Sequence, residues 1–291
     1  MKSETLHPSS LILEKARCHP ALHGLESMAM PYLTANGRRL FYTDQQPDAP
    51  GPALLLLHGA AGSHLVWPGA LRRLAARRVL ALDLPGHGRS DLPGRRTMAH
   101  YAAAVGDFIA AIGAPEIVIA GHSMGGAIAL TVALEPPAAL RGLVLMSVGP
   151  QMRVNDTLLG GGLADFEAAA DFIVTYGFAD APEELRRQTR QAILQAGAAT
   201  TFGDFLACSR FDARARLPGI HLPALVIGGD EDRLTPPRQM DALAAGLLHA
   251  KRARLAGAGH FVMLEQPVEV AALVAGFLAT LPRSTPGQSA V

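Results

Sequence analysis

The sequence predicts an α/β fold, in which a mostly parallel sheet is covered by helices on both faces. Two observations carry this prediction. Short apolar runs bounded by Gly, Pro or Asp read as strands buried on both faces. Longer segments with a helical pattern separate these runs, and parallel strands need crossover connections of that kind.

The composition fits one large domain. The chain has 291 residues, of which 49% are hydrophobic and 18% are charged, with a formal net charge of +1. This balance gives no basic stripe for nucleic acid. The two cysteines, Cys18 and Cys208, are too few for a disulfide framework or a metal cluster, so we expect free thiols, and a single bridge stays the alternative. With no secretory signal visible, a cytoplasmic location is expected.

The candidate elements follow one another in a regular order. Asn36-Gly37 separates two strands at residues 32–34 and 39–43 and indicates a hairpin. Further strands are expected at residues 53–57, 79–82, 117–120, 143–146, 224–227 and, more weakly, 253–255. Helices are expected at residues 65–76, 97–112, 125–134, 238–248 and 268–280. The uncharged stretch 117–134 has polar residues and glycines at its middle, so it predicts a buried strand and helix, not a membrane span.

The alternation is interrupted once, and both ends of the chain depart from it. We expect a loose extension over residues 1–29 and a flexible tail over residues 283–291. Between residues 150 and 217 the pattern is helical and polar, and Gly160, Gly161 and Gly162 mark flexible backbone near its start. This predicts a core of residues 30–149 and 218–282, with a helical cap of residues 150–217 over the carboxyl ends of the strands.

The strongest chemical signal is the segment Gly121-His122-Ser123-Met124-Gly125. It follows an apolar strand and opens an apolar helix, which is the context of a nucleophile turn. Such a turn strains the serine backbone and lifts the hydroxyl off the sheet edge. Glycines on both sides leave room for the neighbouring backbone. We therefore expect Ser123 to be a nucleophile.

A serine hydroxyl needs a base, and the base needs an acid. Among 11 histidines, His260 is favoured because it lies in a Gly-rich loop after the last strand, at the edge where Ser123 emerges. The loop after strand 224–227 offers three carboxylates. Asp232 is favoured because it lies farther around the turn, and Asp230 stays the alternative.

The loop after strand 53–57 is expected to complete the site. The backbone N–H groups of Ala60 and Met124 are the candidate donors to an oxyanion. His58 is expected to shape this turn through hydrogen bonds, and Asp83 to order the neighbouring loop. Six aromatic or apolar side chains are candidates for a substrate pocket or equally for the core, namely Trp67, Met124, Phe172, Phe178, Phe205 and Phe261. Of these, Trp67 and Phe261 are the expected substrate contacts.

Five segments together, HGAAGS, DLPGHGRS, GHSMGG, GGDEDRLTP and GAGHF, resemble the α/β-hydrolase family. The likeness is to its cap-bearing esterase, lactonase and C–C-bond hydrolase branch, over about residues 31–281. It implies an eight-stranded α/β-hydrolase fold, a triad at Ser123, Asp232 and His260, and no metal or organic cofactor. A small-molecule substrate and a monomer or homodimer are expected, without a nucleic-acid or membrane partner.

The motifs are poor guides to the substrate. The expected reaction is hydrolysis of a carboxylic ester or lactone of a small, largely apolar substrate through an acyl-enzyme. Two alternatives use the same triad, namely C–C bond hydrolysis of a diketone and cofactor-free haloperoxidase or perhydrolase chemistry. A non-catalytic ligand receptor of this fold is a further alternative. Phe261 stands where C–C hydrolases often carry Trp, and Ser123 argues against branches with an Asp nucleophile.

Overall fold

The computed structural model describes residues 31–35, 37–155, 158–159 and 165–282. These residues form an eight-stranded sheet in the order β1-β2-β4-β3-β5-β6-β7-β8. The pairs β1–β2 and β2–β4 are antiparallel, and the other neighbours are parallel. The predicted N-terminal extension, Asn36, the glycines 160–162 and the tail lie outside the described residues.

All eight predicted strands are present, several of them longer than predicted. The strands are β1 (Tyr32–Ala35), β2 (Arg38–Gln45), β3 (Ala53–Leu57), β4 (Val79–Leu82), β5 (Ile117–His122), β6 (Leu140–Met146), β7 (Ala224–Gly229) and β8 (Ala250–Leu255). The helices are α1 (Gly69–Arg72), α2 (Met98–Ile112), α3 (Met124–Ala133), α5 (Phe166–Gly177), α6 (Glu183–Ala196), α7 (Ala198–Ser209), α8 (Pro237–Gly246), α9 (Val262–Glu265) and α10 (Pro267–Thr280).

The helix predicted at residues 65–76 is wrong. The structure has a 3₁₀ turn at His64–Val66 and the single turn α1, separated by Trp67 and Pro68 in extended conformation. Proline disfavours the helical conformation in the residue before it, and Pro68 has no N–H for a helical hydrogen bond. The apolar pattern therefore belongs to a segment that packs on the sheet as two short pieces.

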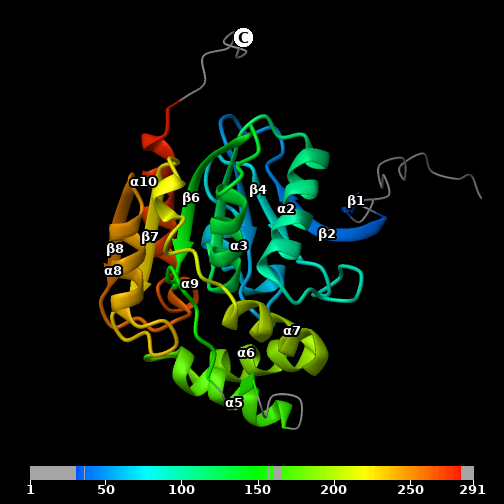
Figure 1. Cartoon of the computed structure of the whole chain (residues 1–291), viewed down its shortest axis with the longest axis vertical. Helices are drawn as coiled ribbons and strands as arrows, with labels where there is room; N and C mark the ends of the chain where they lie inside the picture. Colours follow the sequence, from blue (N-terminus) through cyan, green and yellow to red (C-terminus); the bar gives the residue numbers. More distant parts are fainter. Residues whose placement is uncertain (1–30, 36, 156–157, 160–164, 283–291) are drawn as a thin grey trace, which may run out of the picture. The chain divides into compact units, whose positions relative to one another are not determined.

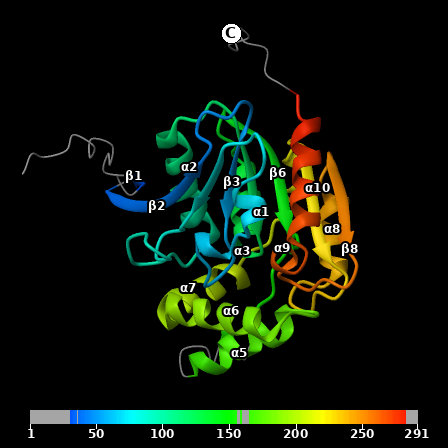
Figure 2. The same cartoon turned by 180° about the vertical axis from the view of Figure 1, so that it is seen from behind.

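Two layers of helices enclose the sheet. The side chains of Leu55 and Leu57 pack on the face that carries α2, α3 and α8, whereas Leu54 and Leu56 pack on the face that carries α1, α9 and α10. Alternate residues of β3 thus enter opposite cores, as the two-residue period of a strand requires. Figures 1 and 2 show the two faces in turn, with α2 and α3 in front in the first view and α10 in front in the second.

The insertion between β6 and β7 is helical, as predicted. Helices α5, α6 and α7 lie together at one end of the sheet in both views (Figures 1 and 2). Because β3, β5, β7 and β8 run parallel, the segments that follow them meet at this end. Among the residues that the structure describes, the helices are too short or too polar to span a bilayer.

Candidate active site

Ser123 stands at the turn between β5 and α3. Its backbone has φ 52° and ψ −116°, a conformation that residues with a side chain rarely adopt. A Cβ at Gly121 would collide with the backbone of Gly125, and a Cβ at Gly125 would collide with the Leu57 carbonyl. The two glycines therefore allow the turn to fit against the end of β3. The strained, tightly packed turn is the one that the sequence predicts.

The structure brings His260 and Asp232 together. The Nδ1 atom of His260 lies 3.0 Å from Oδ2 of Asp232, and the two side chains are nearly fully buried. Asp230 is exposed, and its Oδ1 accepts a hydrogen bond from the Gly257 N–H instead. Of the two carboxylates considered from the sequence, Asp232 is the one that contacts the imidazole.

Thr235 is a polar partner that the sequence analysis missed. Its hydroxyl lies 2.7 Å from Asp232 Oδ2 and 2.9 Å from His260 Nδ1. The backbone N–H groups of Leu234 and Thr235 donate to the other carboxylate oxygen of Asp232. The spacing Asp-x-x-Thr, in which an Asp side chain caps the turn that follows it, is the signal that could have found it.

These contacts favour the ionised form of Asp232. Burial alone would raise the pKa of this carboxyl group. The charge of His260 and the hydrogen bonds from His260 and Thr235 outweigh burial, so the pKa lies below its usual value. A carboxylate at this position orients the imidazole and stabilises its protonated form.

The loop that carries His260 is held from two sides. His122 Nε2 lies 3.0 Å from the His260 carbonyl oxygen, and burial lowers the pKa of His122 to about 3, so its ring is neutral near pH 7. The His260 N–H donates to the Gly177 carbonyl at the end of α5, and Glu265 accepts from the Gly259 N–H. The backbone of this loop is thus held by both the core and the inserted helices.

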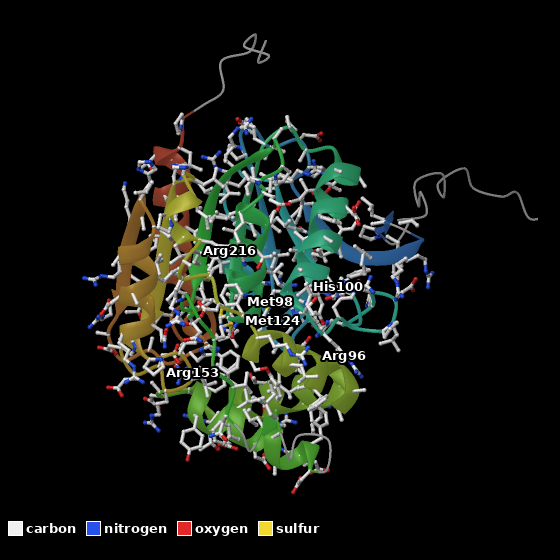
Figure 3. The ribbon with its side chains drawn as sticks, in the orientation of Figure 1. Arg96, Met98, His100, Met124, Arg153 and Arg216 are labelled. Atoms are coloured by element: carbon white, nitrogen blue, oxygen red, sulfur yellow. The ribbon has the colours of Figure 1, made fainter. Side chains whose placement is uncertain are left out.

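The loop after β3 lies directly beside the serine. A Cβ at Gly59 would lie 3.3 Å from Cβ of Ser123, and Ala60 and Ser123 line the same cavity. Among the described residues, neither the Ala60 N–H nor the Met124 N–H donates to a backbone carbonyl. Met124 opens α3 at the end of the sheet nearest the inserted helices (Figure 3). Within the described part of the chain, the structure therefore leaves both N–H groups without a backbone acceptor near Ser123, and their role as oxyanion donors stays a prediction.

His58 shapes this loop, as the sequence analysis expects. The Leu84 N–H donates to Nε2 of His58, so the ring proton is on Nδ1, which donates to the Gly59 carbonyl at 2.8 Å. Burial, followed by the nearby His87, lowers the pKa of His58 to about 4, which keeps the ring neutral near pH 7. The Gly62 N–H donates to the same carbonyl. The peptide unit between Gly59 and Ala60, which carries the Ala60 N–H, is therefore held in place by two hydrogen bonds to its carbonyl oxygen.

Asp83 orders the neighbouring segment. One of its oxygens accepts from the His64 N–H at 2.6 Å, the His64 ring lies within 2.9 Å of both oxygens, and the Arg89 N–H donates to the second. A Cβ at Gly88, where φ is +52°, would collide with this carboxylate. Asp83 thus ties the loop after β4 to the residues that follow the Ala60 loop.

A cavity of about 680 Å³ opens over the serine. Ser123 and His260 both line it, together with the loop 59–63 and side chains of α5, α6 and α7. Phe172, Phe205 and Phe261 contribute apolar surface to its wall. This volume is within the range of pockets that bind small organic molecules.

The expected substrate contact at Trp67 is wrong. Its side chain is 1% exposed and packs in the core with α1 and α10, and it is not among the described residues that line the cavity. The indole therefore belongs to this core and not to the cavity wall. Phe178 is likewise buried in that core, 4.7 Å from the Phe261 ring between centroids.

The described residues do not bring three His, Cys, Asp or Glu side chains together in a way that could hold a metal ion. Cys208, the cysteine in the described part, is buried at the cavity wall with its thiol unbridged. Burial raises the pKa of this thiol.

Comparisons with known proteins identify the family. A family model described as the alpha/beta hydrolase fold matches residues 52–267. The pimeloyl-[acyl-carrier protein] methyl ester esterase of Xanthomonas campestris pv. campestris is 35% identical over 252 residues, covering 80% of this chain and 97% of that protein. The protein of the same name from Stenotrophomonas maltophilia is 34% identical, covering 82% of this chain and 97% of that protein.

Solved structures are similar over most of the chain. A thermophilic esterase has a TM-score of 0.76 and 27% identity, covering 87% of this chain and 98% of that chain. The enol-lactonase from Burkholderia xenovorans has a TM-score of 0.79 at 23% identity, covering 86% of this chain and 100% of that chain, and shares the fold.

Proposed function

The chain belongs to the α/β-hydrolase fold family and is a hydrolase that acts on ester bonds, and from this we propose that Ser123, His260 and Asp232 form its catalytic triad. The observation that carries the proposal is the placement of a strained serine and an Asp-bound histidine on one cavity. Residues 150–217 act in this proposal as a cap over the site.

The proposed reaction begins with attack on the ester carbonyl. Asp232 holds Nδ1 of His260, so the other ring nitrogen, Nε2, takes the proton of the Ser123 hydroxyl. The Ser123 oxygen bonds to the carbonyl carbon, and the resulting oxyanion accepts hydrogen bonds from the Ala60 and Met124 N–H groups. Protonated His260 then gives its proton to the leaving alcohol, and an acyl-enzyme remains. His260 then takes a proton from water, and the water oxygen bonds to the acyl carbon. The bond between this carbon and the Ser123 oxygen breaks, His260 returns the proton to Ser123, and the acid leaves.

The proposed substrate is an ester with a largely apolar acyl chain. Phe172, Phe205 and Phe261 offer apolar surface to such a chain, and Phe261 lies directly beside the His260 ring. The curated relatives are named for the methyl ester of pimeloyl-[acyl-carrier protein]. We therefore place a methyl ester of a medium-length acyl chain first among the candidate substrates. A monomer or homodimer in the cytoplasm stays a prediction.

A matched pair of serine variants tests this proposal. Ser123→Ala removes the nucleophile, and Ser147→Ala removes another buried serine with positive φ, at the carboxyl end of the neighbouring strand β6. We expect Ser123→Ala to lower kcat on p-nitrophenyl esters and on pimelate methyl esters by at least about 10⁴-fold. Ser147→Ala should keep kcat within about threefold. Substantial ester turnover by folded Ser123→Ala would reject the proposal.

A further inference from the structure

Asp204 is a buried carboxylate that the mechanism above does not use. It lies on α7 and has no exposed surface. A buried carboxylate is costly unless hydrogen-bond donors meet its oxygens. Three donors do so here, and each comes from a different segment of the core: the Tyr101 hydroxyl at 2.6 Å from Oδ1, and His87 Nε2 and the Ala61 N–H at 2.8 Å and 2.9 Å from Oδ2.

His87 is fixed in this cluster as a donor on both sides. Its Nδ1 lies 3.1 Å from the Pro85 carbonyl, which only accepts, and its Nε2 faces the carboxylate of Asp204. Burial alone would lower the pKa of His87, but the charge and hydrogen bond of Asp204 raise it overall. Oδ2 of Asp204 thus accepts two hydrogen bonds, one from His87 Nε2 and one from the Ala61 N–H.

Ala61 stands directly after the proposed oxyanion donor. Two peptide units flank Ala60. The first carries the Ala60 N–H, and its carbonyl is held by His58 and Gly62. The second carries the Ala61 N–H, which Asp204 holds from the inserted helices. Ala61 has φ +55°, an unfavourable conformation for a residue with a Cβ, so this arrangement needs support from outside the loop.

We propose that Asp204 is a positioning residue, which fixes the loop at residues 59–62 so that the Ala60 N–H faces the developing oxyanion. The inference rests on the proposed function, because it takes Ala60 as an oxyanion donor. Asp204 is not among the described residues that line the cavity, so it acts through the loop and not by touching the substrate. The cap would therefore complete the oxyanion site as well as enclose it.

Two substitutions of similar size separate the hydrogen bond from the charge. Asp204→Asn and Asp204→Leu both remove the negative charge. In Asp204→Asn the amide oxygen should take the position facing Ala61, because two N–H donors point there, while the amide nitrogen faces the Tyr101 hydroxyl, which can accept. Asp204→Leu leaves the Ala61 N–H without an acceptor.

The expected results differ between the two variants. For Asp204→Leu we expect kcat on a p-nitrophenyl ester to fall by about 10–100-fold with KM within about threefold, because a displaced oxyanion donor affects the transition state. Inhibition by a trifluoromethyl ketone, whose serine adduct carries an oxyanion, should weaken in parallel with kcat/KM. Asp204→Asn should keep kcat within about fivefold. Equal losses in both variants, or a loss confined to KM, would overturn the positioning role.

Tyr101→Phe is the matched control. It removes a hydrogen bond to the same carboxylate, but from Oδ1, the oxygen that does not face the loop. We expect a lower melting temperature with kcat within about twofold of the original chain. A fall in kcat as large as that of Asp204→Leu would mean that the cluster acts only through stability and would overturn the inference.

Two further measurements complete the test. If Asp204→Leu does not fold, the rate of hydrogen exchange at the Ala61 amide is measured in the unsubstituted chain as the test of the hydrogen bond to Asp204. Strong protection supports the bond to Asp204, and exchange at the rate of an open loop overturns it. Ser123→Ala is measured in parallel. Loss of activity there, with full kcat in Asp204→Leu, rejects this inference alone, whereas activity that survives Ser123→Ala rejects the proposed function.

Discussion

Replacing His58 should change how the stability of the protein depends on pH. The pKa of His58 is lowered from 6.5 to about 4 in the folded protein, chiefly by burial. A base with a depressed folded pKa destabilises the fold as pH falls below its unfolded pKa, because the unfolded chain binds the proton more readily. The contribution of neutral His58 to the free energy of unfolding is therefore fully present above pH 6.5, and it is lost progressively as the pH falls toward 4.

The size of the effect follows from the two pKa values. Between pH 7.5 and pH 5, this one group should remove about 2 kcal/mol from the free energy of unfolding, since each pH unit below 6.5 is worth about 1.4 kcal/mol. His58→Asn keeps a donor for the Gly59 carbonyl but leaves the buried Leu84 N–H without its acceptor. That variant should be about 1–3 kcal/mol less stable at pH 7.5.

The two stability curves should therefore converge as the pH falls. Urea unfolding of the original chain and of His58→Asn, followed by circular dichroism from pH 7.5 to pH 5, measures both, and the other titrating groups cancel in the difference. We expect the stability advantage of the original chain to shrink by about 2 kcal/mol. Curves that stay parallel over this range would refute the assignment of His58 as a buried neutral ring.

Three further substitutions test other parts of the account. Thr235→Val removes a hydroxyl 2.7 Å from Asp232, so kcat should fall by about three- to tenfold with an unchanged circular dichroism spectrum; an unaltered kcat would exclude a role in orienting the triad. Trp67→Phe should lower the free energy of unfolding, measured in urea, by about 1 kcal/mol and leave KM unchanged for esters of every chain length, because the indole lies in the core. A KM that changes with chain length would mean that Trp67 contacts the substrate. Phe205→Leu enlarges the cavity, so the ratio of kcat/KM for octanoate over butyrate esters should rise by about threefold or more; an unchanged ratio would mean that the acyl chain lies elsewhere.

The parts of the site that short motifs encode could be predicted from the sequence. The turn at Ser123 is determined by neighbouring glycines and by an apolar strand and helix on either side. The placement of His260 and Asp232 follows from the parallel sheet, because segments after parallel strands meet at one edge. Local chain chemistry and strand direction are sufficient for these residues.

Other features depend on contacts between distant segments. Trp67 is close in sequence to the loop at residues 59–63, but its indole packs in the core. Asp204 is an acid in a helix, and only the tertiary structure shows its three partners at positions 61, 87 and 101. No local pattern predicts such a cluster, because its members are far apart in the sequence.

The most direct test of the proposed triad is to identify the residue that becomes covalently modified. The chain is treated with a fluorophosphonate, digested and analysed by mass spectrometry, beside His260→Gln as a variant that keeps the serine but lacks the base. We expect one adduct on Ser123 and labelling at least about 100-fold slower in His260→Gln. An adduct on another residue, or equally fast labelling without the imidazole, would contradict it.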